Sequence, residues 1–140
     1  MAAQTDTARR LFVAVRAGDE AGGEAALRDG ASVDSELEGC TALIMAIVVH
    51  KHLIVKLLLA RGADVHQPHP SGATAVFAAA MVGSGELVSL LAKAGVDVDI
   101  PDNDGATPAC VAAQRGHVEV VRLLAELGAH LETPMNDGAT

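Results

Sequence analysis

Apolar and polar positions along the chain recur in blocks that predict pairs of short helices. In residues 107–128, a threonine and Pro108 open an alanine-rich stretch that Gly116 closes. A hydroxyl at the N-cap followed by proline at the first helical position is typical of a helix start. Beyond Gly116, apolar residues recur at i, i+3 and i+4 spacing over about 118–127. This spacing predicts a second helix with one buried stripe.

The same block returns every 33 residues. Glycines followed two positions on by threonine form one ladder, and helix-ending glycines form another: Gly39, Gly72, Gly105 and Gly138 with Thr41, Thr74, Thr107 and Thr140, then Gly62, Gly95 and Gly128. A fixed period of this length indicates units that bury their apolar faces by stacking on neighbours. We divide the single domain 1–140 into a degenerate N-terminal cap at about 8–38, units at 39–71, 72–104 and 105–137, and the start of a truncated fifth at 138–140.

The sequence TPACVAAQRGHVEVVRLLAELGA at 107–129 resembles the ankyrin repeat. That family's motif is a Thr-Pro-Leu-His helix start, Ala-Ala, Gly-His, a Val-Val and Leu-Leu helix, and Gly-Ala-Asp. The resemblance covers roughly residues 8 to 140. It implies an all-α solenoid of stacked helix-turn-helix units, with a hairpin-like finger between successive units. It also implies a protein-binding module without catalytic machinery or a cofactor.

The chain departs from the family motif at two kinds of position. The histidine of the helix start is replaced in the successive units by Phe12, Ile44, Phe77 and Cys110. In the family this histidine holds neighbouring units together, so apolar packing is expected to replace it here. His50 stands where the other units have the glycine that joins the two helices. A non-glycine residue with positive φ costs on the order of 1 kcal/mol, which makes the second unit an expected weak joint.

Composition narrows the possible partners and compartments. With Phe12 and Phe77 as the only aromatic residues, the core is expected to be aliphatic. The net charge of −8 makes nucleic acid an unfavourable partner. An N-terminus without an apolar signal segment predicts an intracellular protein, cytoplasmic or nuclear, with Cys40 and Cys110 reduced. The apolar stretch 41–60 is interrupted by charge at its centre, so no membrane span is expected.

Candidate chemistry in the sequence is better explained by turns. The pairs His50 with His52 and His66 with His69 lack the third and fourth ligands that metals require. The acidic segment 97–105 faintly resembles a calcium loop, but its glycine register places apolar residues at ligand positions. Cys110 has no histidine at a motif spacing, and each glycine is accounted for by the repeat. We therefore expect no enzyme, no metal and no cofactor.

The resemblance places the two residues before each helix-joining glycine on the concave face. These pairs are Arg16 and Ala17, Val48 and Val49, Met81 and Val82, and Gln114 and Arg115. The central pairs are apolar and the outer ones largely polar, and an apolar patch with a polar rim is typical of an interaction site. The alternative is that these residues pack against neighbouring fingers or have drifted without function.

The resemblance also directs the finger tips towards partners. The residues concerned are Leu37, Glu38 and Cys40; Pro70, Ser71 and Ala73; Asn103, Asp104 and Ala106; and Asn136 and Asp137. Acidic members favour a basic or amphipathic partner segment, although Asp, Asn and Ser are also common turn formers.

We interpret the chain as a protein–protein interaction module or scaffold that binds a partner on its concave face. One alternative is a regulatory or targeting segment of a larger enzyme, of the kinase or ubiquitin ligase type. Another is a free-standing kinase-inhibitor-like ankyrin protein, which has a similar size. The chain is expected to be a monomer or part of a longer array. Its last residues match the start of a further helix, so it is either an excerpt of such an array or self-capped by its fourth unit.

Overall fold

The computed structural model describes the backbone of residues 2–129 and the side chains of residues 6–129. The chain divides into two compact units, unit 1 (Met1–Asp64) and unit 2 (Val65–Thr140), which we describe separately. The expected fifth unit and the finger residues Asn136 and Asp137 lie outside the described residues. Among the helices of the described part, none is both long enough and apolar enough to cross a membrane.

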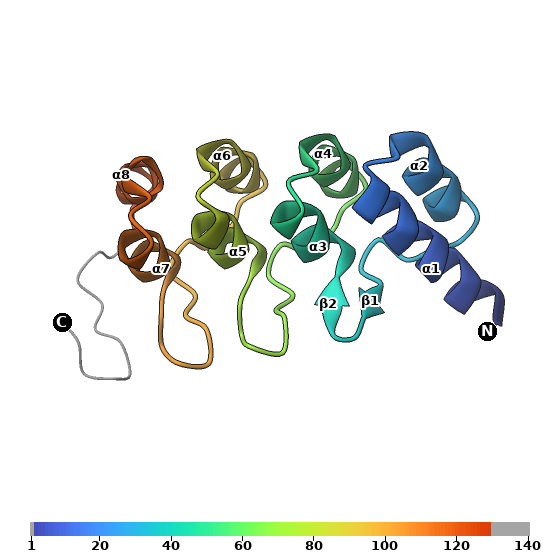
Figure 1. The fold of residues 1–140 in the computed structure, drawn as a ribbon, viewed down its shortest axis with the longest axis horizontal. Helices are drawn as coiled ribbons and strands as arrows, with labels where there is room; N and C mark the ends of the chain where they lie inside the picture. The colour runs from blue at the N-terminus through green and yellow to red at the C-terminus, as the bar shows by residue number, and fades with distance from the viewer. Residues whose placement is uncertain (1, 130–140) are drawn as a thin grey trace. The chain divides into compact units, whose positions relative to one another are not determined.

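Unit 1 consists of two helix pairs joined by a short hairpin. Its elements are α1 (Ala2–Ala17), α2 (Glu20–Arg28), β1 (Glu36–Leu37), β2 (Cys40–Thr41), α3 (Ala42–Val48) and α4 (His52–Ala60). Within each pair the helices pack together; between the pairs α1 packs on α3 and α2 on α4. The first helices therefore form one layer beside the hairpin, and the second helices form the other (Figure 1). α1 begins at Ala2, well before the unit boundary near residue 8 expected from the sequence.

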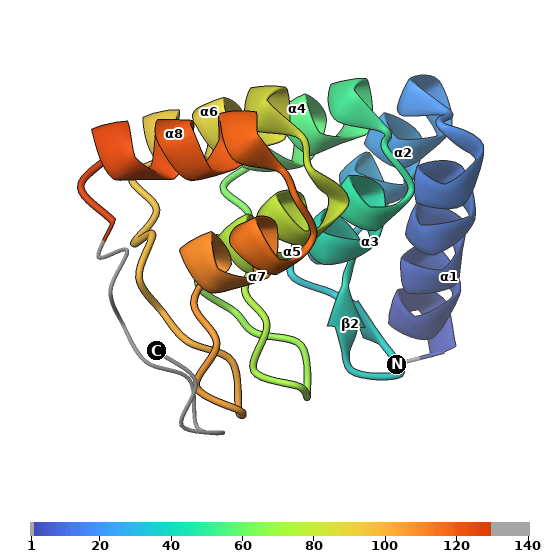
Figure 2. The same cartoon turned by 60° about the vertical axis from the view of Figure 1, so that its left-hand side comes forward.

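Unit 2 repeats this arrangement with two more helix pairs. Its elements are α5 (Ala75–Val82), α6 (Gly85–Lys93), α7 (Pro108–Gln114) and α8 (Val118–Glu126). α5 packs on α7 and α6 packs on α8. The turned view shows the two layers lengthwise, with the connection between α6 and α7 extending beyond the layer of α5 and α7 (Figure 2).

The helix starts follow from local sequence. The hydroxyl oxygens of Thr41, Thr74 and Thr107 each accept a hydrogen bond from the backbone N–H three residues on, at 3.2, 3.4 and 3.2 Å. Each threonine has extended backbone angles, as an N-cap requires, and Pro108 occupies the first turn of α7. The predicted N-caps are therefore confirmed in all three repeats that begin with a threonine.

The core is aliphatic, as expected. Its largest fully buried side chains include Leu11, Leu43, Ile47, Ile54, Leu58, Leu87, Leu91 and Leu124. At the position where the ankyrin motif has histidine, the side chains of Phe12, Ile44 and Phe77 are buried, and that of Cys110 is half-buried. Burying one such aliphatic or aromatic side chain contributes about 1.5–3 kcal/mol, so apolar packing is the main stabilising interaction in each unit.

The fingers are hairpin-like turns, and the two units close them differently. In unit 1, β1 pairs antiparallel with β2, and the two central turn residues, Glu38 and Gly39, have φ of 54° and 83°. Positive φ at both central positions is the requirement of a type I′ turn. In unit 2 the finger turns are closed by backbone bonds from Gly72 N–H to His69 O (2.8 Å) and from Gly105 N–H to Asp102 O (3.1 Å). Hairpin-like fingers are what the resemblance to the ankyrin repeat implied.

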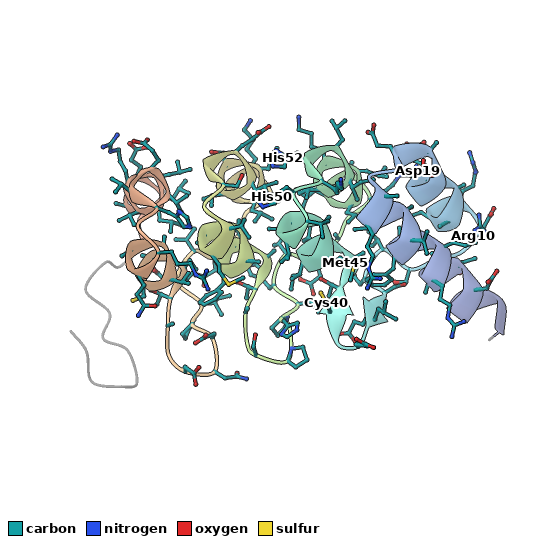
Figure 3. All side chains as sticks on the ribbon, viewed as in Figure 1. Arg10, Asp19, Cys40, Met45, His50 and His52 are labelled. Carbon is teal, nitrogen blue, oxygen red and sulfur yellow. The ribbon has the colours of Figure 1, made fainter. Side chains whose placement is uncertain are left out.

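His50 adopts the left-handed backbone conformation predicted for it, with φ of 61°. It occupies the turn between α3 and α4 (Figure 3), where its N–H bonds to Ile47 O at 3.1 Å. The conformation is imposed by the helix-to-helix turn, and an L side chain with a Cβ is strained in it.

Replacing His50 with glycine is expected to raise the free energy of unfolding by roughly 1 kcal/mol, because glycine adopts this conformation without a steric penalty. Urea unfolding followed by circular dichroism at the helical minimum measures the change. His50→Asn is the matched comparison and is expected to give a smaller gain, since asparagine tolerates the left-handed region better than histidine. A lower stability for His50→Gly would show that the imidazole contributes more than the strain costs.

Candidate functional site

In unit 2, four predicted site residues lie at the ends of two packed helices. α5 ends with Met81 and Val82, α7 ends with Gln114, and Arg115 is its C-cap. Met81 and Val82 are half-buried, whereas Gln114 and Arg115 are exposed. Because α5 and α7 are neighbours, their ends place a partly apolar strip beside a polar one. Arg115 is the C-cap residue, and a positive charge near the C-terminal end of a helix is favourable.

The fingers of unit 2 bring Ser71 and Asn103 together. The Asn103 N–H donates to Ser71 O at 2.9 Å, and its side-chain Nδ2 donates to Pro70 O at 2.8 Å. The Ser71 hydroxyl is in turn 3.0 Å from His69 Nδ1. Ser71 and Asn103 thus hold two successive fingers together as well as being exposed, while the exposed Asp104 is the acidic group at the tip of the second finger.

In unit 1, the predicted residues fall at opposite ends of α3. Val48 is the last residue of this helix and is 44% exposed, and Val49 is its half-buried C-cap. Leu37 and Glu38 belong to the hairpin that precedes the helix start, where Glu38 is exposed. The structure therefore separates a helix-end pair from a finger pair by the length of one short helix. That Val48 and Val49 neighbour the apolar pair of unit 2 stays a prediction.

His66 and His69 of unit 2 act as hydrogen-bond acceptors in turns. His66 Nε2 accepts the backbone N–H of Asp97 at 3.0 Å, and His69 Nδ1 accepts the N–H of Ser71 at 3.1 Å. In unit 1, Asp34 Oδ1 occupies the register of His66 and accepts the N–H of Asp64 at 2.8 Å. Throughout residues whose side chains are described, no three His, Cys, Asp or Glu side chains gather as a metal-binding group.

Acidic side chains in the segment 97–105 support its turn geometry. Asp97 Oδ1 accepts the N–H of Asp99 at 3.0 Å. Asp102 Oδ1 accepts the N–H groups of both Asp104 (2.9 Å) and Ala106 (3.0 Å). These bonds use the carboxylates to fix the finger, which is the role that Asp favours in turns.

Cys40 lies in β2 at the base of the hairpin and is half-buried (Figure 3). Burial raises the pKa of its thiol, with a smaller opposing effect from a backbone hydrogen bond with Met45. The Sγ also lies 3.4 Å from Thr41 O, as donor. A thiol with a raised pKa is largely protonated at neutral pH and is a poor nucleophile.

The sequence reasoning missed the polar bonds that join successive fingers. It predicted that apolar packing replaces the family histidine. Side chains of Asp34, His66 and Asn103 also bond the following or preceding finger. The signal was present, because Asp34 and His66 occupy one register position just after the second helix of successive units. In unit 2, a further polar bond joins successive helix pairs, since His117 Nε2 donates to Met81 O at 3.1 Å.

Comparison with known proteins agrees with this geometry. A family model described as ankyrin repeats (3 copies) matches residues 47–135, which is more than half of the chain. A search of curated proteins finds no match. The helix pairs, the fingers and the family match together show that the chain belongs to the ankyrin-repeat family.

Proposed function

We propose that this protein is a scaffold that binds a partner protein through its helix ends and finger tips. Ankyrin repeats are generally protein–protein interaction modules. The observation that carries the proposal is the strip in unit 2, where half-buried Met81 and Val82 adjoin exposed Gln114 and Arg115 on packed neighbouring helices. Exposed apolar atoms bordered by polar groups are typical of interaction surfaces.

The fixed geometry of the fingers supports binding without much loss of conformational freedom. Asn103 is anchored to Pro70 and Ser71, and Asp102 fixes its own turn. Surfaces that are already ordered lose little entropy on binding, so more of the contact energy appears as affinity. The exposed carboxylates of Glu38 and Asp104 favour a basic or amphipathic partner segment.

Replacing Val49 and Met81 together with aspartate is expected to reduce partner capture at least about tenfold, because charge then replaces apolar contact at the helix ends. Affinity capture from cells with tagged full-length chain, quantified by mass spectrometry, measures this loss. Leu53→Asp is the control, since Leu53 is an exposed residue of α4 that is not among the predicted site residues. Circular dichroism must show unchanged helical signal in both variants. Equal capture by the double variant and by wild type would remove the helix ends from the binding surface.

A further inference from the structure

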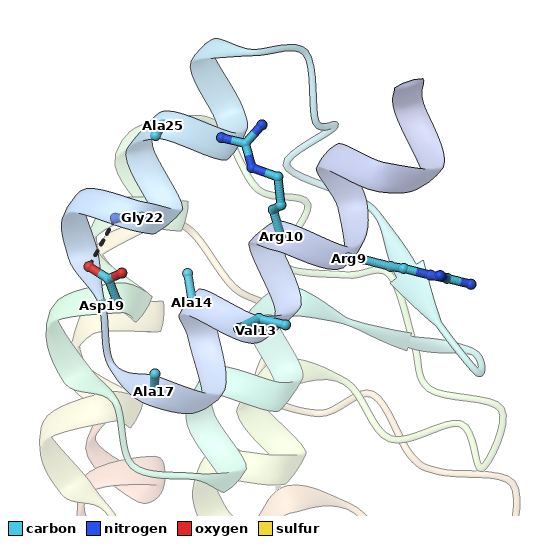
Figure 4. Close-up of a pocket in the computed structure, with 8 residues that line it drawn as sticks. All are labelled: Arg9, Arg10, Val13, Ala14, Ala17, Asp19, Gly22 and Ala25. Carbon is cyan, nitrogen blue, oxygen red and sulfur yellow. Dashed lines mark hydrogen bonds between the residues drawn. The ribbon is translucent and has the colours of Figure 1, made fainter. Parts of the chain in front are cut away.

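A second candidate surface lies in unit 1, between α1 and α2. A groove of about 340 Å³ follows the face formed by these two helices (Figure 4). Its walls are Ala14 and Ala17 from α1 and Gly22 and Ala25 from α2, and Val13 stands beside it. Apart from Ala17, which is the last residue of α1, the groove residues are distinct from the helix ends and finger tips described above.

The groove exists because α2 has small residues at positions where α4 has large aliphatic side chains. Ile54 and Leu57 of α4 reach the surface of α2, where their side chains lie 3.9 and 3.5 Å from the position of a Cβ on Gly23. The first two repeats are offset by 32 residues, so Ile54 and Leu57 correspond to Gly22 and Ala25. The outward face of α2 therefore lacks the aliphatic side chains with which α4 fills its neighbour. This face of α2 can accommodate side chains from a partner but has no large side chains of its own to insert.

Val13 is the one large apolar side chain on α1 that projects from this face into solvent. It is 68% exposed, although its register equivalent in α7, Val111, is 7% exposed in a helix that packs on α5. Val13 thus occupies a position that is buried in α7 but is exposed in α1, beside the groove. Together, the projecting Val13 and the small side chains of Ala14, Ala17, Gly22 and Ala25 form a knob and a hole on one surface.

Charges of opposite sign mark the two ends of the groove. Arg9 and Arg10 border one end, and the Asp19 carboxylate borders the other (Figure 4). Arg10 is held by Asp29 at 2.9 Å, whereas the exposed Arg9 extends beyond the groove. With three arginines and one aspartate, α1 carries a net charge of +2 in a chain whose net charge is −8. Asp29 offsets the charge of Arg10, so one end of the face is basic through Arg9. The middle is apolar, and the other end carries the Asp19 carboxylate, which also caps α2.

We infer that this face binds a second copy of the chain as a two-fold symmetric dimer. A two-fold axis through the middle of the groove sets the basic end of one copy against the acidic end of the other. The same operation inserts Val13 of each copy into the hollow of its partner. A surface that is complementary to itself in this way is what an isologous interface requires. The inference departs from the monomer expected from the sequence and is independent of the proposed partner-binding surface.

Sedimentation velocity of the full chain over micromolar to millimolar concentrations tests the dimer. Wild type is expected to show a concentration-dependent shift from monomer to dimer and no larger species. Val13→Asp is expected to raise the dimer dissociation constant at least about tenfold, since a charge would enter the apolar hollow. Leu53→Asp makes the same change at an exposed leucine of α4 and is expected to leave the dimer intact. Circular dichroism checks that both variants keep their helices.

Charge variants test the polarity of the face separately from its shape. Arg9→Glu is expected to weaken the dimer about tenfold, and the same change at the exposed Lys56 of α4 is the control. Asp19→Asn keeps an N-capping side chain on α2 and is expected to weaken the dimer as well, because only the charge is removed. A monomer at every concentration, a dimer unaffected by Val13→Asp and Arg9→Glu, or a series of larger species would each overturn the inference.

Discussion

Replacing Gly83 with alanine is expected to lower the free energy of unfolding by about 3 kcal/mol. Gly83 ends α5 with φ of 79°, a conformation that costs an L residue about 1–2 kcal/mol. A Cβ at this position would also lie 2.6 to 2.9 Å from three ring atoms of His117. The ring cannot retreat freely because its Nε2 bonds to Met81 O at 3.1 Å, so a further 1–3 kcal/mol of overpacking is expected. Urea unfolding monitored by circular dichroism measures the loss.

Gly116 provides the matched control for this variant. It occupies the same place after α7, with φ of 76°, but nothing lies within 4 Å of a Cβ added there. Gly116→Ala is therefore expected to cost only the backbone strain, about 1–2 kcal/mol. In the double variant Gly83→Ala with His117→Ala the clash disappears, so the two changes should couple favourably by at least about 0.5 kcal/mol. Equal losses for Gly83→Ala and Gly116→Ala would show that the imidazole adjusts without cost.

The elements that the sequence predicted well are those decided within a few residues of the chain. A threonine at the N-cap bonds the N–H three residues on whatever its surroundings, so Thr41, Thr74 and Thr107 could be placed from spacing alone. The left-handed turn at His50 also followed from register, because the chain must reverse there even without glycine. Local rules repeated at a fixed period make such a fold readable before its structure is known.

The features that escaped prediction depend on which side chains meet across 30 or more residues. The bond from Asn103 to Pro70 spans 33 positions, and the bond from Asp97 to His66 spans 31. Asn and Asp are common in turns of every kind. The sequence therefore could not distinguish a residue that only forms its own turn from one whose side chain also bonds to the neighbouring finger. Asn103 and Ser71 were predicted as partner contacts, with turn formation as the alternative.

The groove on α1 and α2 was missed because its signal is the absence of side-chain volume. Ala25 is common in helices, and Gly22 by itself indicates only a weaker helix. The missing volume becomes evident when Ile54 and Leu57 are found packed at the equivalent positions of α4. Arg9 and Arg10 belong to the segment that the sequence predicts as a degenerate N-terminal cap. The structure places them at one end of the groove for which we propose a second copy of the chain as the partner.

Replacing Leu58 with alanine is expected to lower the free energy of unfolding by about 2–5 kcal/mol. Leu58 lies in α4 and is 0% exposed, so its truncation leaves a cavity in the layer that α2 and α4 share. With Phe12 and Phe77 as the only aromatic side chains, the chain has few bulky groups that could collapse into the space. The loss is therefore expected towards the upper half of that range, as measured by urea unfolding.

Leu53 makes the comparison decisive because it is the same residue type in the same helix. It is 56% exposed, and Leu53→Ala is expected to change stability by less than about 0.5 kcal/mol. Helix propensity affects both variants equally, since leucine becomes alanine in α4 each time. The difference between the two losses in free energy of unfolding therefore measures the contribution of burying the leucine side chain. Similar losses at both positions would mean that α4 does not present a single buried stripe, and the helix-pair stacking of unit 1 would then be wrong.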